Sequence, residues 1–560
     1  MKKIQYILGG LALIAFPLGV QAQKQAKDST VNRTVVVEQE YNPDIMDASK
    51  INVMPQVEPP TVSKKAVEYD ATLVPAGQIP ATVMQAYTGK ETQTKALPGY
   101  VRLGYGSKGN LDARANYLFT FSDRDRLNLT LQMNGMDGKL ELPGDLVKWN
   151  AYYYHTYTGM DYTHAFKKVD MNVAGNFDLS NFNFLPGSVN NKQKFTAGSL
   201  HFGVKSTGDE LPVQFRAETN LLLYGRQHEL SYTDTKESIV RTLAEASAPI
   251  SEEQSVGVAL AMDNAFYKNN QFEDYTALNL TPYYLFENDD WKIRLGAHVD
   301  FAFGFGKEFY ASPDVMVQYT FSDSYQLYAQ AKGGKQLNDF RRMETVSPYG
   351  QTMIQPEATY EQLNAALGFK ASPATGLWFN LYGGYQNLKN DLLQMQFSAY
   401  DITGDYPHST GDYPHSTENH LLLGTADTQN AYVGAEASYD YKGLISFSAS
   451  GIYRNWSIDD EDINKYGLLF KPSLEAKFEA GFRPVSAAWV NVGYQHIDRE
   501  KVEGEKANPV SNLYLGGSYE FFKGISVYAR INNLLNKNYQ YYWGYPTEGI
   551  NFLGGVSFKF

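Results

Sequence analysis

The chain has 560 residues, of which 43% are hydrophobic and 14% aromatic, with 47 glycines and no cysteine. The absence of cysteine excludes disulfide bonds and thiolate metal sites. A formal net charge of -12 argues against a nucleic-acid partner, because no basic stripe is present to neutralise phosphates.

The N-terminal residues have the organisation of a secretory signal peptide. Two lysines precede an apolar run from Ile7 to Val20, and a small-residue cleavage site ends at Ala22. The run is too short for a comfortable membrane-spanning helix, and no cysteine follows the site, which excludes attachment as a lipoprotein. The sequence therefore predicts that residues 1–22 direct export and are removed.

Residues 23–97 are rich in charge and proline and show little periodicity, which favours an extended periplasmic arm over a packed domain. Within the arm, "TVVVEQEYNP" combines a short β-prone run with a turn. Such a segment offers a strand edge to a partner and becomes ordered on binding. The residues expected to bind a periplasmic protein are Val35, Val36, Val37, Tyr41, Asn42 and Pro43.

From Pro98 to Phe560 the sequence consists of segments with alternating hydrophobicity, separated alternately by tight polar turns and longer connections. This pattern predicts an all-β fold, an integral outer-membrane antiparallel β-barrel of about 22 strands. The mean hydropathy of -0.40 does not oppose a membrane location, because only every second residue of a barrel strand faces lipid. A soluble solenoid or sandwich has similar spacing, but the export signal and even strand count make it the weaker interpretation.

One segment of the barrel region has a helical pattern instead. In residues 234–249, Asp234 and Glu237 have the spacing of a capping box, and Ile239 and Leu243 lie on one helical stripe that ends before Pro249. By strand parity this predicts a helix on the periplasmic side. It would pack on the barrel rim or serve as a docking element.

Two motifs fall in predicted extracellular connections. The tandem repeat "GDYPHSTGDYPHST" (404–417) places His408 and His415 in equivalent settings, and a duplication in a surface loop is favoured over a divalent-cation site, so no metal is predicted. The run "YQYYWGYP" (539–546) is interpreted as part of an interfacial aromatic girdle, in preference to a site that stacks on a sugar or porphyrin.

The final strands supply the remaining candidate residues. Alternation over "ISVYARIN" predicts that the lumen is lined by Ser526, Tyr528, Arg530 and Asn532. The chain then ends in a strand on Phe558 and Phe560, which resembles the terminal signal read by the outer-membrane assembly machinery. A barrel explains such an ending, because its last strand pairs with its first and leaves no free edge.

Residues 525–560 resemble the C-terminal end of TonB-dependent receptors of the Bacteroidota type, through Asn532 to Tyr539, Gly544 to Pro546 and Gly554 to Phe560. The resemblance implies a barrel of about 22 strands with a plugged lumen. The residues before Pro98 are too few for the plug domain of that family. "TVVVEQEY" (34–41) is similar to the box by which such receptors contact the energising TonB protein.

Catalysis finds no support, because the nine histidines are scattered and no nucleophile motif is present; we expect neither an enzyme nor a cofactor. Two functions remain for a protein in the outer-membrane lipid of a Gram-negative cell. One is a transport or channel component, and the other is a structural subunit whose arm docks TonB or another envelope protein. In either case the arm, a partner protein or inward-folded loops must fill the lumen.

Overall fold

The computed structural model describes residues 97–142, 148–186, 192–207, 211–229, 232–322, 324–352, 354–397, 420–458 and 465–560. The predicted signal peptide, the Val35–Pro43 segment of the arm and the tandem repeat at 404–417 lie outside these residues.

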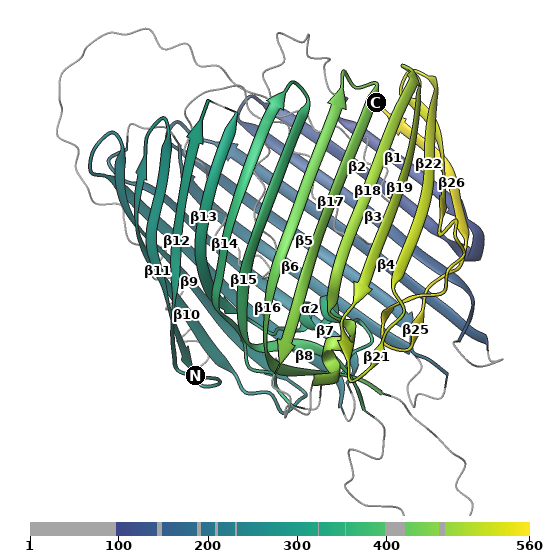
Figure 1. Cartoon of the computed structure of the whole chain (residues 1–560), viewed down its shortest axis with the longest axis horizontal. Helices are drawn as coiled ribbons and strands as arrows, with labels where there is room; N and C mark the ends of the chain where they lie inside the picture. The colour runs from purple at the N-terminus through teal and green to yellow at the C-terminus, as the bar shows by residue number, and fades with distance from the viewer. Residues whose placement is uncertain are drawn as a thin grey trace, which may run out of the picture.

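The described chain forms a closed antiparallel barrel of 22 strands (Figure 1). Each wall strand pairs with the next wall strand along the chain, and β26 pairs with β1. The predicted all-β barrel and its strand number are confirmed. The wall strands are β1 (Gly99–Gly106), β2 (Leu111–Ser122), β3 (Asp125–Glu141), β4 (Lys148–Ala165), β5 (Val169–Asn183), β6 (Lys192–Ser206), β7 (Gln214–Glu229), β8 (Tyr232–Pro249), β9 (Gln254–Lys268), β10 (Tyr275–Glu287), β11 (Trp291–Phe303), β12 (Phe309–Phe321), β13 (Tyr325–Gln336), β14 (Thr359–Ala374), β15 (Leu377–Phe397), β16 (His420–Tyr441), β17 (Ile445–Ile458), β18 (Pro472–Val485), β19 (Ala488–Arg499), β22 (Val510–Phe522), β23 (Ile525–Asn532) and β26 (Asn551–Lys559).

The seam between β26 and β1 closes the sheet. Val101 lies opposite Phe558, and the backbone N–H of Gly99 donates to the carbonyl of Phe560 at 2.8 Å, with the reverse bond at 3.0 Å. The ring of Phe560 lies beside Tyr117 with centroids 6.0 Å apart. The expected pairing of the last strand with the first is therefore confirmed.

The two rims of the barrel differ in the length of their connections. Tight turns join β2 to β3, β16 to β17 and β22 to β23, and the C-terminus lies at the same rim, which is uppermost in Figure 1. In the β16–β17 turn, Lys442 and Gly443 both have positive φ, of 51° and 65°. We call this the short-turn rim and the opposite one the loop rim. In outer-membrane barrels these face the periplasm and the exterior respectively.

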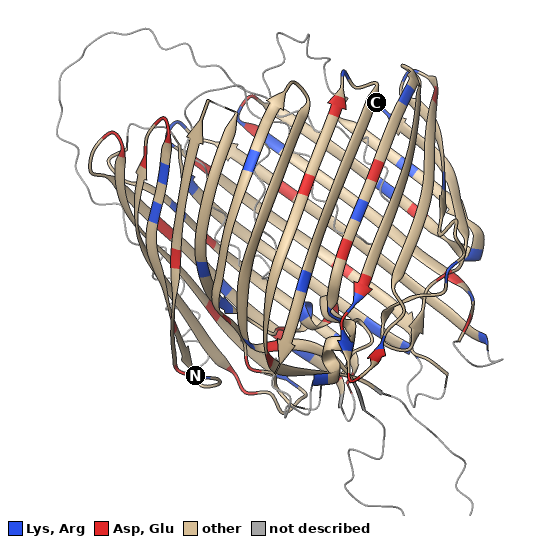
Figure 2. Ribbon diagram, viewed as in Figure 1, with Lys and Arg blue, Asp and Glu red and all other residues tan. Residues whose placement is uncertain are grey.

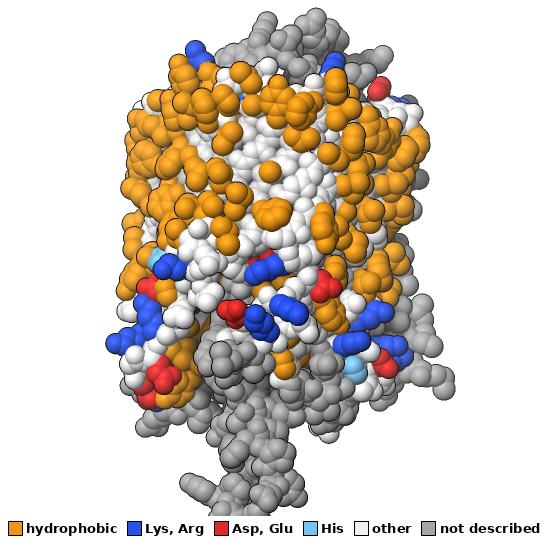
Figure 3. Space-filling view, turned by 90° about the vertical axis from the view of Figure 1, so that its right-hand side faces the viewer, with side chains coloured by type: hydrophobic (Ala, Val, Ile, Leu, Met, Phe, Trp, Pro, Cys, Tyr) orange, Lys and Arg blue, Asp and Glu red, His pale blue; other side chains and the backbone are white. Residues whose placement is uncertain are grey.

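Side chains alternate between the two faces of the wall. On β23, Ile525 and Val527 are exposed on the outside, whereas Tyr528 and Arg530 are buried on the inside. Figure 3 shows hydrophobic side chains spread over the outer wall, with charged residues gathered towards the loop rim. Charged residues within the barrel strands are distributed over the wall in Figure 2. This arrangement is what a lipid-facing exterior and a polar interior require.

Glycine makes room for tyrosine rings on the inner wall. A Cβ atom built at Gly493 would lie 2.2 Å from the ring of Tyr514, so only glycine leaves space for that ring. The same arrangement recurs where the ring of Tyr283 covers Gly257 and that of Tyr328 covers Gly368. The phenol groups then reach polar partners on neighbouring strands, as in the 3.0 Å bond from Tyr328 to Asn380.

The predicted helix at 234–249 is wrong, because this segment is the wall strand β8. Thr235, Glu237 and Ile239 are buried on the inner face, with Lys236 exposed between the first two, which is the alternation of a strand. β8 pairs along its length with β7 and β9, and those ladders outweigh the local helical pattern. It belongs to the wall and is not a periplasmic insert.

Candidate functional site

The connection between β13 and β14 spans residues 337–358, and its described parts, 337–352 and 354–358, fold into the lumen near the loop rim. We call this connection the strap. It contains α2 (Phe340–Val346), which lies within the outline of the barrel in Figure 1. Asp339 caps this helix, with its carboxylate accepting from the N–H of Arg342 at 2.8 Å. Within the described residues, no helix is both long and apolar enough to span a membrane.

An apolar layer holds the strap against the inner wall. Phe340 is 1% exposed and Met343 is fully buried, and the Phe340 ring meets Tyr224 and Tyr267 with centroids 5.7 and 5.9 Å apart. Wall residues of this layer come from β3 to β9 and also from β15 and β16, so the strap contacts both sides of the lumen. They include Leu140, Trp149, Phe182, Phe195, Tyr224, Ile239, Ala265, Leu392, Leu421 and Leu423.

Arg226 of β7 binds the strap from inside this layer. Its side chain is completely buried, and its guanidinium lies 4.8 Å from the centroid of Phe195 and 5.5 Å from that of Phe340. Its Nη1 donates to Glu229 at 2.9 Å and to the carbonyl of Gly350 at 3.2 Å. Arg226 therefore joins the wall to both the beginning and the end of the strap.

Three carboxylates of the site also accept hydrogen bonds between wall and strap. Glu229 accepts from the N–H and hydroxyl of Thr352 at 2.8 and 3.2 Å, and Glu237 accepts from the N–H of Phe340 at 3.1 Å. Glu344 of the strap accepts from the hydroxyls of two wall residues. Those donors are Tyr224 and Ser180, at 2.8 and 3.1 Å. Glu229 and Glu237 are buried, and their bonds to Thr352 and Phe340 form only when the strap lies in the lumen.

The opposite wall holds the strap through its backbone. The N–H of Gln351 donates to the carbonyl of Leu421 at 3.0 Å, and its carbonyl accepts from the N–H of Leu423 at 2.8 Å. On β15, the side-chain amide of Gln394 donates to the carbonyl of Val346 at 3.1 Å. The strap is thus hydrogen-bonded to β7 and β8 on one side and to β15 and β16 on the other.

A second inward-folded connection, residues 533–550, completes the closure. It contains β24 (Gln540–Tyr542) and β25 (Tyr545–Pro546), and Tyr545 stacks on Tyr349 of the strap with centroids 3.6 Å apart and planes at 8°. Burial raises the pKa of Tyr349 well above its usual value and that of Tyr542 to about 12, which keeps these phenols neutral. The predicted aromatic girdle at 539–546 is therefore wrong, because the strap and not lipid covers Tyr545.

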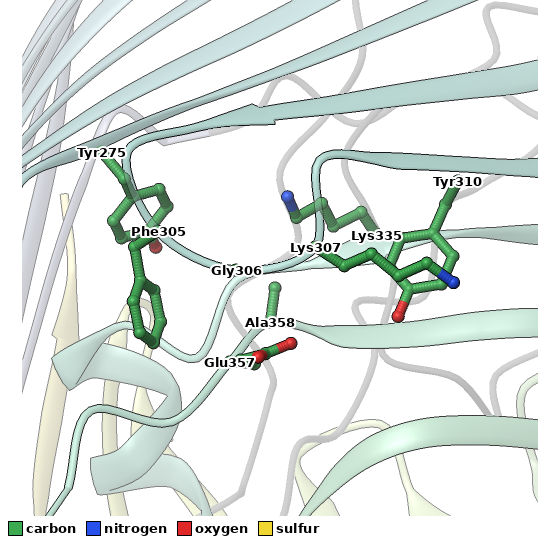
Figure 4. A pocket seen from close by; sticks show the side chains of 8 residues that line it. All are labelled: Tyr275, Phe305, Gly306, Lys307, Tyr310, Lys335, Glu357 and Ala358. Carbon is green, nitrogen blue, oxygen red and sulfur yellow. The ribbon is translucent and has the colours of Figure 1, made fainter.

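A small pocket lies where the two ends of the strap join the wall (Figure 4). Lys335 and Glu357 contribute opposite charges, and Phe305 contributes an aromatic ring. The ammonium of Lys307 lies 4.3 Å from the centroid of Tyr310. Movement of the strap would change this pocket, because Glu357 and Ala358 belong to the strap and Lys335 lies two residues before it.

The residues predicted to line the lumen lie on the inner face of β23 or form polar contacts there. The hydroxyl of Tyr528 donates to Asp112 at 3.0 Å, and the guanidinium of Arg530 lies 4.6 Å from the centroid of Tyr514. Asn532 donates to Asn551 at 3.0 Å, and Ser526 is half-buried. A role of these four residues in a solute route stays a prediction. Phe558 and Phe560 are exposed on the outside.

Sequence reasoning missed the residues that bind the strap. Arg226, Glu229 and Glu237 lie on β7 and β8, far in sequence from the residues they contact. A signal existed in "NDFRRME" (338–344), where Asp339 can cap a helix that presents Phe340 and Met343 on one face. Such an apolar pair in a connection between strands indicates a loop that packs inward.

The described barrel of 22 strands has the architecture of the TonB-dependent receptor barrels, which it resembles in fold. No protein-family model and no curated protein matches the sequence. Solved structures do match in fold at low identity.

The siderophore receptor PirA from Acinetobacter baumannii superposes with a TM-score of 0.62 at 11% identity, covering 84% of this chain and 81% of that one. FpvA of P. aeruginosa, bound to a heterologous pyoverdine, gives 0.61 at 12% identity over 83% and 72%. The copper transporter OprC gives 0.58 at 12% identity over 84% and 82%. These are receptors and a transporter, in agreement with the expectation of a non-enzymatic barrel.

Proposed function

We propose that this protein is a transport component of the cell outer membrane whose lumen is gated at the loop rim by the strap. The observation that carries the proposal is the attachment of the strap to both walls, through Arg226 and Glu237 on one side and Leu421 on the other. A barrel of this strand number is wide enough to pass solutes unless something fills it. Passage then requires the strap to leave the lumen.

The receptors and the transporter that share this fold support the transport class, although the substrate of this chain does not follow from theirs. Energised transport would use the predicted TonB contact at 34–41. A second function, a structural subunit of an envelope complex, is favoured by one feature. The strap is buried as deeply as a protein core, with Met343 fully enclosed, which suits a permanent filling.

The test is to replace residues 339–352 with a Gly/Ser segment of equal length and to record single-channel conductance in planar bilayers. We expect higher conductance and greater sensitivity of cells to large antibiotics. The matched control replaces the equally long repeat at 404–417, which should change neither conductance nor antibiotic sensitivity.

A second variant removes Gln23 to Lys95 and retains the signal peptide. If only that variant raises conductance, the arm closes the lumen and the proposed strap gate is wrong.

A further inference from the structure

The wall between β12 and β13 is not paired along its whole length. The ladder between these strands ends at the pair of Asp314 and Lys332, whereas Phe309–Pro313 of β12 pairs only with β11. Beyond Lys332, β13 contains a bulge and pairs with β14 instead, as in the pair of Lys335 and Tyr360. All residues of both strands are described, so the missing pairs form a gap in the ladder. We call this gap the slit.

Two residues at the base of the slit explain why the ladder ends there. Pro313 has no backbone N–H to donate, and proline is otherwise confined to edge strands and bulges. In Gly333 of β13, an added Cβ atom would lie 2.5 Å from the Cβ atom of Ser312 and 2.5 Å from the carbonyl oxygen of Glu361. The two strands therefore touch at Ser312 and Gly333, and the slit extends from there to the loop rim.

The slit lies in the part of the wall that faces the outer leaflet. Pro313 is eight residues from Phe321 at the short-turn end of β12. With about 3.3 Å per residue and a strand tilt of about 40°, the slit begins roughly 20 Å from that end, within an apolar band about 25 Å tall. Phe309 and Ala311 are exposed on the outer face beside it. Backbone without a ladder partner is tolerated at this depth only where protein buries it or a water-filled cavity adjoins it.

On the inner side, two tyrosine rings cover the slit. Tyr310 of β12 stacks on Tyr360 of β14 with centroids 4.0 Å apart and planes at 20°, and Tyr360 is 1% exposed. Tyr310 also lines the pocket at the ends of the strap together with Lys335 of β13 (Figure 4). A side-chain stack thus takes the place of the backbone ladder at the point where the strap leaves the wall.

We propose that the slit is a side portal through which a single-chain amphiphile with an acidic head group passes between the lumen and the outer leaflet. The proposal rests on the transport function proposed above, because it names the class of solute transported. The apolar chain would lie on Phe309 and Ala311, and the head group would pass the tyrosine stack to reach the pocket. Lys307 and Lys335 outnumber the one carboxylate that lines this pocket, Glu357, which favours an acidic head group.

The width of the slit selects one acyl chain. Because the strands still touch at Ser312 and Gly333, separation of Tyr310 from Tyr360 opens a gap only between neighbouring strands. A fatty acid chain fits such a gap, whereas a phospholipid would have to bring two chains through it. Opening breaks a side-chain stack and no ladder hydrogen bond, so a thermal fluctuation can open the portal.

The test uses the full-length protein in proteoliposomes that contain a fatty acid with a photoactivatable diazirine in its chain. Labelled residues are mapped by mass spectrometry. In wild type we expect labelling of the inward-facing Tyr310 and Ser312 as well as the outward-facing Phe309. The control site is Tyr382, which faces inward on β15 where pairing to both neighbouring strands is continuous, and which should remain unlabelled. A diazirine phospholipid should label Phe309 and not Ser312.

A Y310A/Y360A variant removes the stack and should increase labelling of Ser312 by roughly 2- to 12-fold, the range that an aromatic pair contributes to an equilibrium. The matched control is Y382A/Y432A, which removes two inward-facing tyrosines whose centroids lie 6.4 Å apart on paired strands. The control variant should label Ser312 as wild type does.

Three outcomes would overturn the portal. The first is labelling confined to outward-facing residues in both wild type and Y310A/Y360A. The second is equal labelling of Ser312 and Tyr382, which would show entry through the aqueous lumen, and the third is labelling of Ser312 by the phospholipid. These results are separate from the strap experiment, since unchanged conductance after strap replacement contradicts the gate and leaves the portal standing.

Discussion

At the scale of single residues, Arg226 connects the wall to both ends of the strap, through Phe340 and Gly350. We expect Arg226→Met to weaken the closed strap by about 3–5 kcal/mol, because Glu229 would remain buried without its cationic partner. The barrel should still assemble, since Arg226 forms these bonds through its side chain and not through the strand ladder. Conductance in planar bilayers should therefore rise while the yield of folded barrel is retained.

The matched control for this change is Arg294→Met. Arg294 is also a buried wall arginine, paired with Asp314 at 2.7 Å and lying over the ring of Tyr283, and both of these residues belong to wall strands. The Arg294→Met change should lower the thermal stability of the barrel with little effect on conductance. Equal conductance changes in the two variants would show that loss of any buried arginine loosens the barrel.

Phe560 makes a different contribution, because its side chain is 56% exposed on the outer wall while its backbone closes the seam. We expect Phe560→Asp to lower the amount of protein in the outer membrane and to increase periplasmic degradation. A charge on the lipid face costs less near the interface than at the midplane, so the defect should be in assembly rather than in final stability. Quantitative blotting of membrane fractions tests this, and wild-type abundance of the variant would contradict it.

At the scale of elements, β8 shows why a local pattern misled the prediction. A strand that faces a polar lumen places charged residues such as Glu237 and Arg241 where a soluble sheet would place apolar ones. Apolar and polar residues then no longer alternate clearly along the strand. The apolar positions that remain have helical spacing, at Ile239, Leu243 and Ala246. Glu237, expected to cap its own helix, instead accepts from the first N–H of α2 in a distant part of the chain.

The stack of Tyr349 on Tyr545 makes the closure sensitive to alkaline pH. Because burial raises the pKa of Tyr349, the neutral phenol stabilises the closed strap fully below the ordinary phenol pKa near 10. That stabilisation is lost as the pH rises through the higher pKa of the closed state. We expect conductance to increase reversibly above about pH 10, and Tyr349→Phe to move the onset to higher pH. Conductance that stays constant to pH 11 would argue against a closure that depends on this stack.

At the scale of the whole molecule, the arm decides between transport and scaffold. We expect Val36→Asp combined with Tyr41→Ala to release a periplasmic protein in cell crosslinking experiments, because the first change places a charge in the β-prone run and the second removes an aromatic contact. Barrel assembly should be unaffected. Release of TonB with failure to grow on a scarce nutrient supports active transport, and release of another envelope protein with unchanged uptake supports the scaffold. If no partner depends on the arm, docking through it is wrong.

The sequence was sufficient for the barrel and insufficient for its closure, for a physical reason. Strand alternation, tight turns and the terminal strand are local patterns, and together they predicted the number of strands and the pairing of β26 with β1. The site depends on contacts such as those of Arg226 with Gly350 or Tyr349 with Tyr545, between residues far apart in the chain. Only the closed barrel brings these side chains together, so neither the partners of the strap nor the inward position of 539–546 could be predicted from strand periodicity. The apolar pair of Phe340 and Met343 indicated only that this loop packs inward.

The attachment of the strap to both walls also has a mechanical consequence. Strand number and stagger fix the perimeter of a closed sheet, but a given perimeter can enclose either a round or a flattened cross-section. Hydrogen bonds from the strap to β7 and β8 and to β16 set a distance across the ring at the loop rim. At the loop rim, the strap therefore resists flattening of the barrel by lateral pressure from the bilayer, in addition to the resistance of the sheet. At the short-turn rim the described residues include no segment that crosses the lumen, so the barrel should flatten more easily there.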